Sequence, residues 1–88
     1  MKPAIFPDAQ QALSETIRIC ALSKGMPLYI VADFAGIRYR VLSGILAGTK
    51  EPTLNMLIAI VYALRVDPVE FVQMVIRRHN KIQKQTRR

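Results

Sequence analysis

Two arginines and a tyrosine stand side by side in the stretch AGIRYRVLSGILAG, residues 35–48. Arg38, Tyr39 and Arg40 lie just after a glycine, at the start of a short predicted helix. A guanidinium group stays positively charged and donates hydrogen bonds as a planar fork, and a tyrosine hydroxyl can donate another. This chemistry favours binding of an anionic or hydrogen-bonding partner. The alternative is that the three side chains only form a solvated helix surface.

The rest of this predicted helix has one apolar side and one side of small residues. The apolar side is predicted to be buried and consists of Leu42, Ile45 and Leu46. The open side carries Ser43, Gly44 and Ala47 after the arginines. Small residues let another surface approach a helix closely. Two alternatives remain, because Ser43 could be surface filler and Gly44 could allow close packing of two helices.

Groups that could support catalysis or metal binding are sparse. The only histidine, His79, lies among basic residues near the end of the sequence, and the only cysteine, Cys20, occupies an apolar helical position. Asp33 and Glu51 form no recognisable acid–base pair. No Cys/His cluster has the spacing of zinc ligands, and no glycine-rich phosphate loop is present. The sequence therefore predicts a non-enzyme without metal or cofactor, in which Cys20 is a small core residue.

Positive charge is unevenly distributed over the 88 residues. The formal net charge is +7, which favours an anionic partner. Up to residue 76, seven lysines and arginines face six acids, whereas the remaining residues contain six lysines and arginines and no acid. We therefore expect one small domain at residues 1–76 and a basic C-terminal tail at residues 77–88.

The start of the sequence has no long apolar run, so it does not resemble a secretory signal. No segment reaches the roughly 18 apolar residues that suggest a membrane-spanning helix. With one cysteine, no internal disulfide is possible. These features together predict a cytoplasmic protein that does not enter a membrane.

Apolar spacing and turn residues divide the chain into five helical segments, and no strand pattern competes. Glycines are placed to end three segments, and polar residues to cap the start of three: Gly25, Gly36 and Gly48, and Asp8, Thr53 and Asp67. The second segment is predicted to bury Ile30, Val31 and Phe34. The fourth, residues 54–64, is apolar almost all round, as is typical of a central, buried helix. The fifth, after Asp67, has an apolar surface wider than one core stripe.

Several short motifs in order resemble one family. They are VAD at residues 31–33, GI at 36–37, LSGILAG at 42–48, P-T-L-x-x-L-x-x-I-x-x-A-L-x-V at 52–66 and VEF at 69–71. In this order and spacing they resemble the lambda-repressor and Cro-like helix-turn-helix proteins, the XRE family, over about two thirds of the chain. The resemblance implies an all-α, five-helix lambda-repressor-like bundle that contains a helix-turn-helix.

In such proteins the third helix lies in the major groove of double-stranded DNA, with its N-terminal residues against base edges. The resemblance therefore implies that DNA is contacted by Arg38, Tyr39, Arg40, Ser43 and Gly44. An arginine fork fits guanine O6 and N7, and a tyrosine can donate to phosphate or pack on a thymine methyl group. Short side chains suit the part of the helix that lies deepest in a groove about 12 Å wide.

Two positions depart from the family pattern. Many relatives start the second helix with a glutamine that contacts phosphate, but this chain has Leu28, which cannot donate. The substitutes available for phosphate contact are Tyr29, Lys24, Lys50 and Thr49. Many relatives also have a glutamate at the position of Leu46, where an apolar residue still suits the core.

The leading functional hypothesis is a sequence-specific DNA-binding transcription regulator. It would act by occupancy, as a repressor rather than an activator, and as a homodimer on a palindromic operator. The predicted dimer interface is Tyr62, Phe71, Val72, Met74 and Val75. The alternative is that these residues are used inside the monomer.

A second hypothesis belongs to another class. In it the bundle is a protein-interaction module for a partner such as a toxin or a polymerase subunit. The basic tail then binds nucleic acid without sequence preference.

Overall fold

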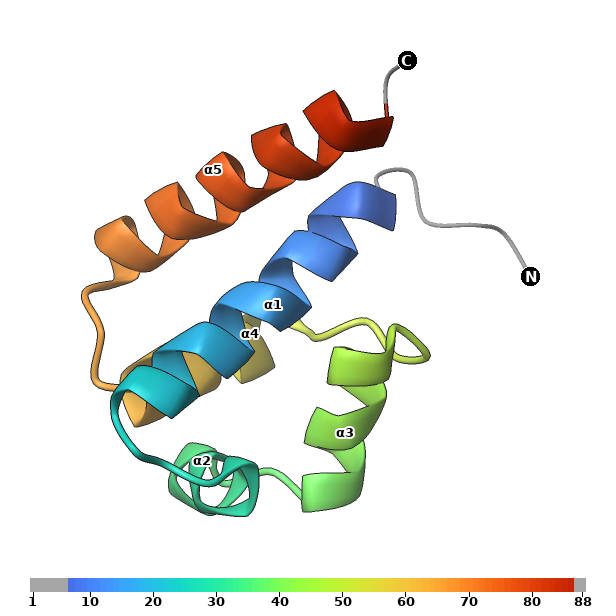
Figure 1. Ribbon diagram of the computed structural model, residues 1–88. Coiled ribbons are helices and arrows are strands. Elements are labelled where there is room, and N and C mark those ends of the chain that lie inside the picture. Colours follow the sequence, from blue (N-terminus) through green and yellow to red (C-terminus); the bar gives the residue numbers. More distant parts are fainter. Residues whose placement is uncertain (1–6, 87–88) are drawn as a thin grey trace.

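The computed structural model describes residues 7–86, which form five helices and no strand (Figure 1). In chain order the helices are α1 (Pro7–Ser23), α2 (Leu28–Ala35), α3 (Tyr39–Ala47), α4 (Leu54–Ala63) and α5 (Pro68–Thr86). α5 packs along α1 and runs in the opposite direction, while α4 packs against α2, and α3 packs against α1 and α2. This arrangement confirms the predicted all-α bundle, with α2 and α3 as its helix-turn-helix.

The turn between α2 and α3 depends on a glycine. Gly36 has a φ of 71°, in the left-handed region that residues with a side chain seldom adopt. This conformation lets the amides of Gly36 and Ile37 donate to the carbonyl oxygens of Asp33 and Ala32, at 3.1 and 3.0 Å. These bonds satisfy carbonyl groups that the last turn of α2 leaves without a helical partner. The chain therefore passes from α2 into α3 within a few residues.

Side-chain caps begin the last two helices as the sequence predicts. The hydroxyl oxygen of Thr53 accepts a hydrogen bond from the amide of Met56 at 3.1 Å. A carboxylate oxygen of Asp67 accepts from the amides of Val69 and Glu70, at 2.9 and 3.1 Å. The prediction that Asp8 caps α1 is wrong, because the helix already begins at Pro7. Asp8 instead lies in the first turn, where its negative charge favours the positive end of the helix dipole.

Removing the Asp67 cap should lower stability without touching the rest of the bundle. We expect Asp67→Ala to reduce the free energy of unfolding by about 1 kcal/mol, because two amides of the first turn of α5 lose their acceptor. Urea denaturation followed by circular dichroism measures the change. Asp67→Asn is the matched control, since its side-chain oxygen can still accept. Equal stability of the alanine variant and the wild type would contradict the capping role.

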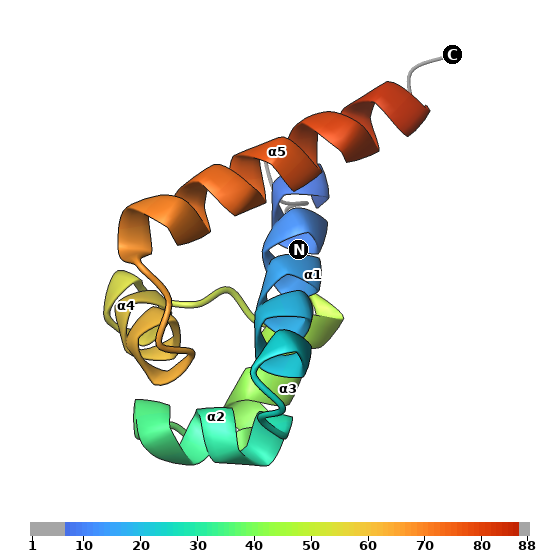
Figure 2. The ribbon, with the colours of Figure 1, turned by 60° about the vertical axis from the view of Figure 1, so that its left-hand side comes forward.

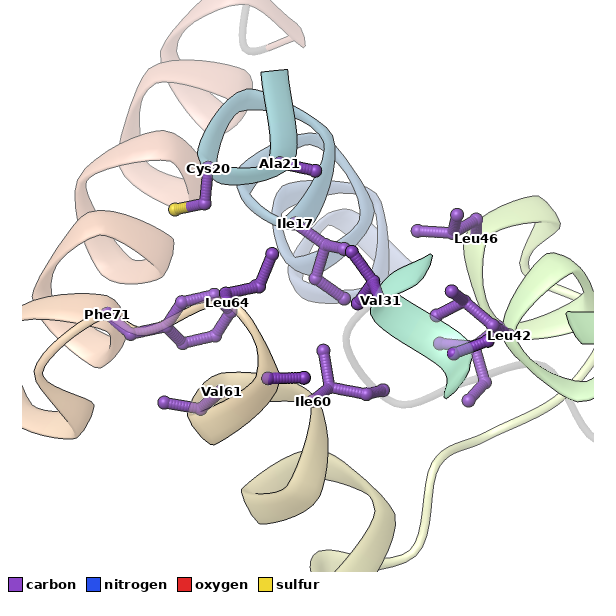
Figure 3. Close-up of a cluster of buried hydrophobic side chains, with 13 residues drawn as sticks. Ile17, Cys20, Ala21, Val31, Leu42, Leu46, Ile60, Val61, Leu64 and Phe71 are labelled. Atoms are coloured by element: carbon purple, nitrogen blue, oxygen red, sulfur yellow. The ribbon is translucent and has the colours of Figure 1, made fainter. Parts of the chain in front are cut away.

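All five helices contribute to one hydrophobic core (Figure 3). Its fully buried side chains include one or more from each helix: Ile17, Val31, Leu42, Ile60 and Phe71. Cys20 is also buried in this cluster, as predicted for a small core residue.

The predicted inner face of α2 is partly wrong. Val31 is buried, but Phe34 is 58% exposed, and Ala32 is buried in its place. The side of α2 that packs on α1, α3 and α4 follows the spacing i, i+3, i+4, i+7 and consists of Leu28, Val31, Ala32 and Ala35. Phe34 lies outside this stripe. Because α2 is short, apolar spacing alone does not tell which stripe its neighbours will cover.

The prediction that α4 is buried on all sides is also wrong. Ile60, Val61 and Ala63 are buried, whereas Leu54, Ile58 and Tyr62 are 72%, 45% and 66% exposed. The three exposed residues are spaced by four, so they form one stripe along the helix. The neighbours of α4 in the described chain are α2 and α5, and they leave this stripe uncovered.

α5 continues past residue 76, where the charge distribution predicts the start of a separate tail. The helix runs without a break to Thr86. Two contacts explain its length, because Ile82 is 6% exposed and the Nε of Arg78 lies 2.9 Å from a carboxylate oxygen of Glu15 on α1. Residues 77–86 of the predicted tail therefore continue α5 as a helix. Arg87 and Arg88, also assigned to the tail, lie outside the described residues.

Candidate nucleic-acid interface

α3 is held by its apolar side and presents its polar side to solvent. Leu42, Ile45 and Leu46 are buried, as predicted. The hydroxyl of Ser14 on α1 donates a hydrogen bond to the carbonyl oxygen of Leu46 at 2.8 Å, which fixes the end of α3 against α1. α2 and α3 lie at the end of the bundle opposite to α5 (Figure 2). The structure therefore leaves one side of α3 free for a partner.

The side chains predicted to contact DNA lie on this free side or next to it. Tyr39 and Arg40 stand in the first turn of α3, and Ser43 follows one turn later, all three exposed. Arg38 precedes them with extended backbone angles, φ −70° and ψ 141°, so it is the N-cap residue and not the first helical residue. The predicted start of α3 is thus one residue too early. Because the backbone of Arg38 is extended, its side chain leaves the backbone in a different direction from that of Arg40.

Gly44 is the exception among these residues, because the space at its missing side chain is already filled. A Cβ atom placed there would lie 3.0 and 3.1 Å from Cγ and Cδ of Lys50, and 3.3 Å from the hydroxyl oxygen of Thr49. These distances are shorter than the roughly 3.5–4.0 Å of an ordinary contact between carbon atoms. In the chain without DNA, the stem of Lys50 therefore occupies the space that Gly44 leaves open.

The loop after α3 is fixed by several hydrogen bonds. The amides of Thr49 and Lys50 both donate to the carbonyl oxygen of Gly44, at 2.9 and 3.2 Å, and the hydroxyl of Thr49 donates to the same oxygen at 3.2 Å. From α1, the side-chain amide of Gln10 donates to the carbonyl oxygen of Lys50 at 3.4 Å. The hydroxyl hydrogen of Thr49 is therefore already used within the fold. The role of Gln10 could not be predicted from the sequence, because it lies 40 residues from Lys50.

The remaining predicted contacts lie on the other flank of the helix-turn-helix. Tyr29 is 62% exposed in the first turn of α2. The ammonium of Lys24, in the turn between α1 and α2, donates to the carbonyl oxygen of Arg65 at 3.3 Å. Lys50 is tied to α1 at Gln10, which precedes Lys24 by 14 residues, so the two lysines stand on the order of 20 Å apart. They flank α2 and α3 and do not form one cluster.

The described residues offer little for other chemistry. No group of three His, Cys, Asp or Glu side chains within residues 7–86 is placed to hold a metal ion. Burial raises the pKa of the Cys20 thiol, although the nearby positive charge of Lys24 partly opposes this, so the thiol is a poor nucleophile at neutral pH. In the same part of the chain, none of the helices combines the length and apolar character that a membrane crossing needs.

A second surface is an apolar groove formed by α1, α4 and α5, with a volume of about 580 Å³. Of the residues predicted for a dimer interface, Tyr62 and Val72 line this groove and are 66% and 53% exposed, and Val75 lines it half-buried. Phe71 is 1% exposed and belongs to the core (Figure 3), and it is also among the residues that line the groove. Met74 is half-buried and packs against the core. Phe71 is therefore used inside the monomer, and Met74 is partly used there.

Sequence reasoning missed two large residues of the groove, Leu54 and Ile58 on α4. Leu54, Ile58 and Tyr62 follow one another at intervals of four residues, and this spacing is the signal that could have identified the leucine and isoleucine positions. The groove therefore joins the exposed stripe of α4 to the exposed apolar side of α5, which includes Val72 and Ile76.

Comparisons with known proteins place the fold among DNA-binding regulators. No protein-family model matches the chain, and a search of curated proteins found no match. Among solved structures, the chain is similar to the restriction-modification controller protein C.Esp1396I, with 27% identity and a TM-score of 0.75 over 80% of this chain and 92% of that one. The same protein has been solved as a tetramer with its natural 35 base-pair operator, which matches with 27% identity and a TM-score of 0.75 over 81% and 93% of the two chains.

A second solved protein shares the fold over nearly the whole chain. The clp gene regulator ClgR from Corynebacterium glutamicum matches 97% of this chain and 86% of its own, with a TM-score of 0.80 and 20% identity. At this level of identity the likeness concerns the fold alone.

Proposed function

We propose that this chain is a transcription regulator that binds operator DNA through α3. The observation that carries the proposal is the free side of α3, which presents Tyr39, Arg40 and Ser43 while the opposite side is fixed in the core. The likeness to C.Esp1396I, solved in complex with its operator, supports the same role for this chain.

The proposed contacts divide into two kinds. Arg40 and Ser43 lie on the exposed side of α3, so they are placed to meet base edges in the major groove. Arg38 lies beside the helix at the N-cap, and the stem of Lys50 rests on α3 at Gly44. We assign both cations to phosphates that flank the groove. Tyr39, at 51% exposure, can donate to phosphate or pack on a thymine methyl group. Lys24 and Tyr29 supply contacts at the α2 flank, in place of a donor at Leu28.

A homodimer is the proposed functional unit. The apolar groove of α1, α4 and α5 lies away from the free side of α3, so a second copy can cover it while both recognition helices remain free. Two-fold symmetry would place these helices about 34 Å apart, one turn of DNA. A protein that only occupies a promoter blocks transcription, so we propose repression as the mode of action.

Selection of bound sequences from random duplex DNA tests this proposal. We expect enrichment of an inverted repeat whose half-sites are centred about one helical turn apart. Enrichment of a single unrepeated half-site would contradict the dimer. Absence of any enriched sequence would contradict the proposed function.

The alternative function, a protein-interaction module with a basic arm, is favoured by one observation. Arg77, Lys81 and Lys84 are exposed, and their spacing of four and three places them on one side of α5. They form a basic stripe that acids do not balance. Equal affinity for the selected sequence and for random duplex would favour this function over the first.

Replacing the basic stripe separates the two functions. Because α5 packs on α1 and α4, apart from α2 and α3, we expect a triple alanine variant of Arg77, Lys81 and Lys84 to keep its preference for the operator. The slope of log affinity against log salt should flatten by less than about one unit per monomer, the value of one phosphate contact. A salt titration on operator and random duplex measures both quantities. Flattening by two units or more per monomer would support the nonspecific arm.

A further inference from the structure

Gly44 and Lys50 form a contact that no sequence motif predicts. The aliphatic stem of Lys50 lies across α3 at the position where any other residue would place its Cβ atom. Gly44 is in the middle of a regular helix, and the backbone there does not require glycine for its conformation. Glycine costs helix stability of about 1 kcal/mol relative to alanine, so something other than helix formation explains it.

The path of the loop brings Lys50 to this place. Gly48 turns the chain with a φ of 80°, and the amides of Thr49 and Lys50 then bind back to the carbonyl oxygen of Gly44. Gln10 holds the carbonyl oxygen of Lys50 from the other side. The backbone of Lys50 is therefore fixed, and the stem has the bare backbone of Gly44 to lie on.

The contact brings the stem of Lys50 to the side of α3 that carries the proposed recognition side chains. Arg40 precedes Gly44 by four residues, so the two positions are neighbours on one side of α3. Beyond Cδ the side chain has only one further methylene before the ammonium, so the charge lies close to the atoms that rest against Gly44. A lysine side chain in solution samples many rotamers, and resting it on a fixed surface removes much of that freedom before the partner binds.

We propose that Gly44 is a positioning residue: its missing side chain seats the stem of Lys50, which holds the Lys50 ammonium against the DNA beside Arg40. This rests on the proposed function. An alanine at Gly44 would push the stem outward, because its Cβ atom is fixed to the helix and the stem is the part that can move. The rival explanation is that glycine is needed so that DNA itself can approach α3.

A double-mutant cycle decides between these explanations. Lys50→Met keeps an unbranched stem and removes the charge. We expect Lys50→Met to weaken operator binding at least fivefold at low salt and to flatten the salt slope by about 0.9 units per monomer. We expect Gly44→Ala also to weaken operator binding, and to flatten the salt slope by less than Lys50→Met does. In the Lys50→Met background, Gly44→Ala should change affinity less than twofold, because no charge remains to be misplaced.

Other results of the cycle overturn the inference. An equal loss from Gly44→Ala with and without the Lys50 charge would show that Gly44 itself faces the DNA. Full affinity of either single variant would also refute it. Gln73→Ala is the control, since Gln73 is exposed on α5, which does not pack against α3, and this variant should leave both the affinity and the salt slope unchanged. Thermal melting of all variants excludes unfolding as the cause, and alanine in place of glycine favours the helix.

A measurement without DNA separates failure of this inference from failure of the proposed function. In the free protein, nuclear Overhauser effects between the α protons of Gly44 and the γ and δ protons of Lys50 are expected. Absence of these effects would show that the stem of Lys50 does not rest on Gly44, even if the protein binds its operator. A wild-type protein that selects no sequence would instead overturn the proposed function, and with it the role of Lys50 at DNA.

Discussion

Arg40→Ala is expected to lower the affinity for the selected operator about 5- to 150-fold while random duplex loses much less. This range corresponds to the roughly 1–3 kcal/mol of discrimination that one bidentate contact to a base edge provides. Arg40 is exposed in the first turn of α3, on the side opposite to the buried Leu42 and Ile45, so it is the arginine placed to enter the groove. Titration of both duplexes at one salt concentration measures the two losses.

Arg38→Ala provides the comparison for this result. Arg38 carries the same charge two residues earlier, but it is the N-cap residue and leaves beside the helix. We expect its replacement to weaken operator and random duplex by similar factors, as for a phosphate contact. If the Arg40 variant also lost affinity equally for both duplexes, Arg40 would be a phosphate contact and not a base contact.

Val72→Glu is expected to dissociate the proposed dimer and, with it, to weaken operator binding strongly. Val72 is 53% exposed at the apolar groove, so a glutamate is tolerated by the monomer but would lie unpaired in a covered interface. An uncompensated buried charge costs about 3–5 kcal/mol, which corresponds to a dimer dissociation constant raised on the order of 100-fold or more. Analytical ultracentrifugation measures the dissociation constant, and circular dichroism checks that the monomer stays folded.

Gln73→Glu is the matched control for the dimer interface. Gln73 follows Val72 on α5, is exposed, and lies outside the groove, so its replacement introduces the same charge away from the proposed contact. This variant should remain dimeric. The proposed dimer would be refuted if the Val72 variant kept the dissociation constant of the wild type, or if the wild type were monomeric at micromolar concentration.

Much of the site could be predicted because its determinants are local. Gly36 ends α2 and Gly48 ends α3 through their own backbone conformation, and Thr53 and Asp67 cap helices through bonds to residues two or three positions away. The period of the α-helix likewise places Leu42, Ile45 and Leu46 on one side of α3 and Arg40 and Ser43 on the other. Sequence spacing therefore already fixes which side chains α3 can offer to a partner.

Which apolar surfaces are covered was decided only by the tertiary structure. Phe34 and Phe71 both stand in apolar helical patterns, yet Phe34 is exposed and Phe71 fills the core, because α2 and α5 meet their neighbours on particular stripes. The length of α5 depends in the same way on Ile82 and on the pairing of Arg78 with Glu15, far away in sequence.

The contact between Lys50 and Gly44 likewise depends on tertiary structure, although both residues lie within the proposed interface. The sequence alone supplies a glycine in a helix and a lysine in the following loop, each of which has several uses. Their contact exists because the loop turns back onto α3 and because the side chain of Gln10, on α1, donates a hydrogen bond to the carbonyl oxygen of Lys50. Local chemistry thus determined the helices, their ends and the side chains of α3, while packing between distant segments determined which of those side chains are free and where their charges lie.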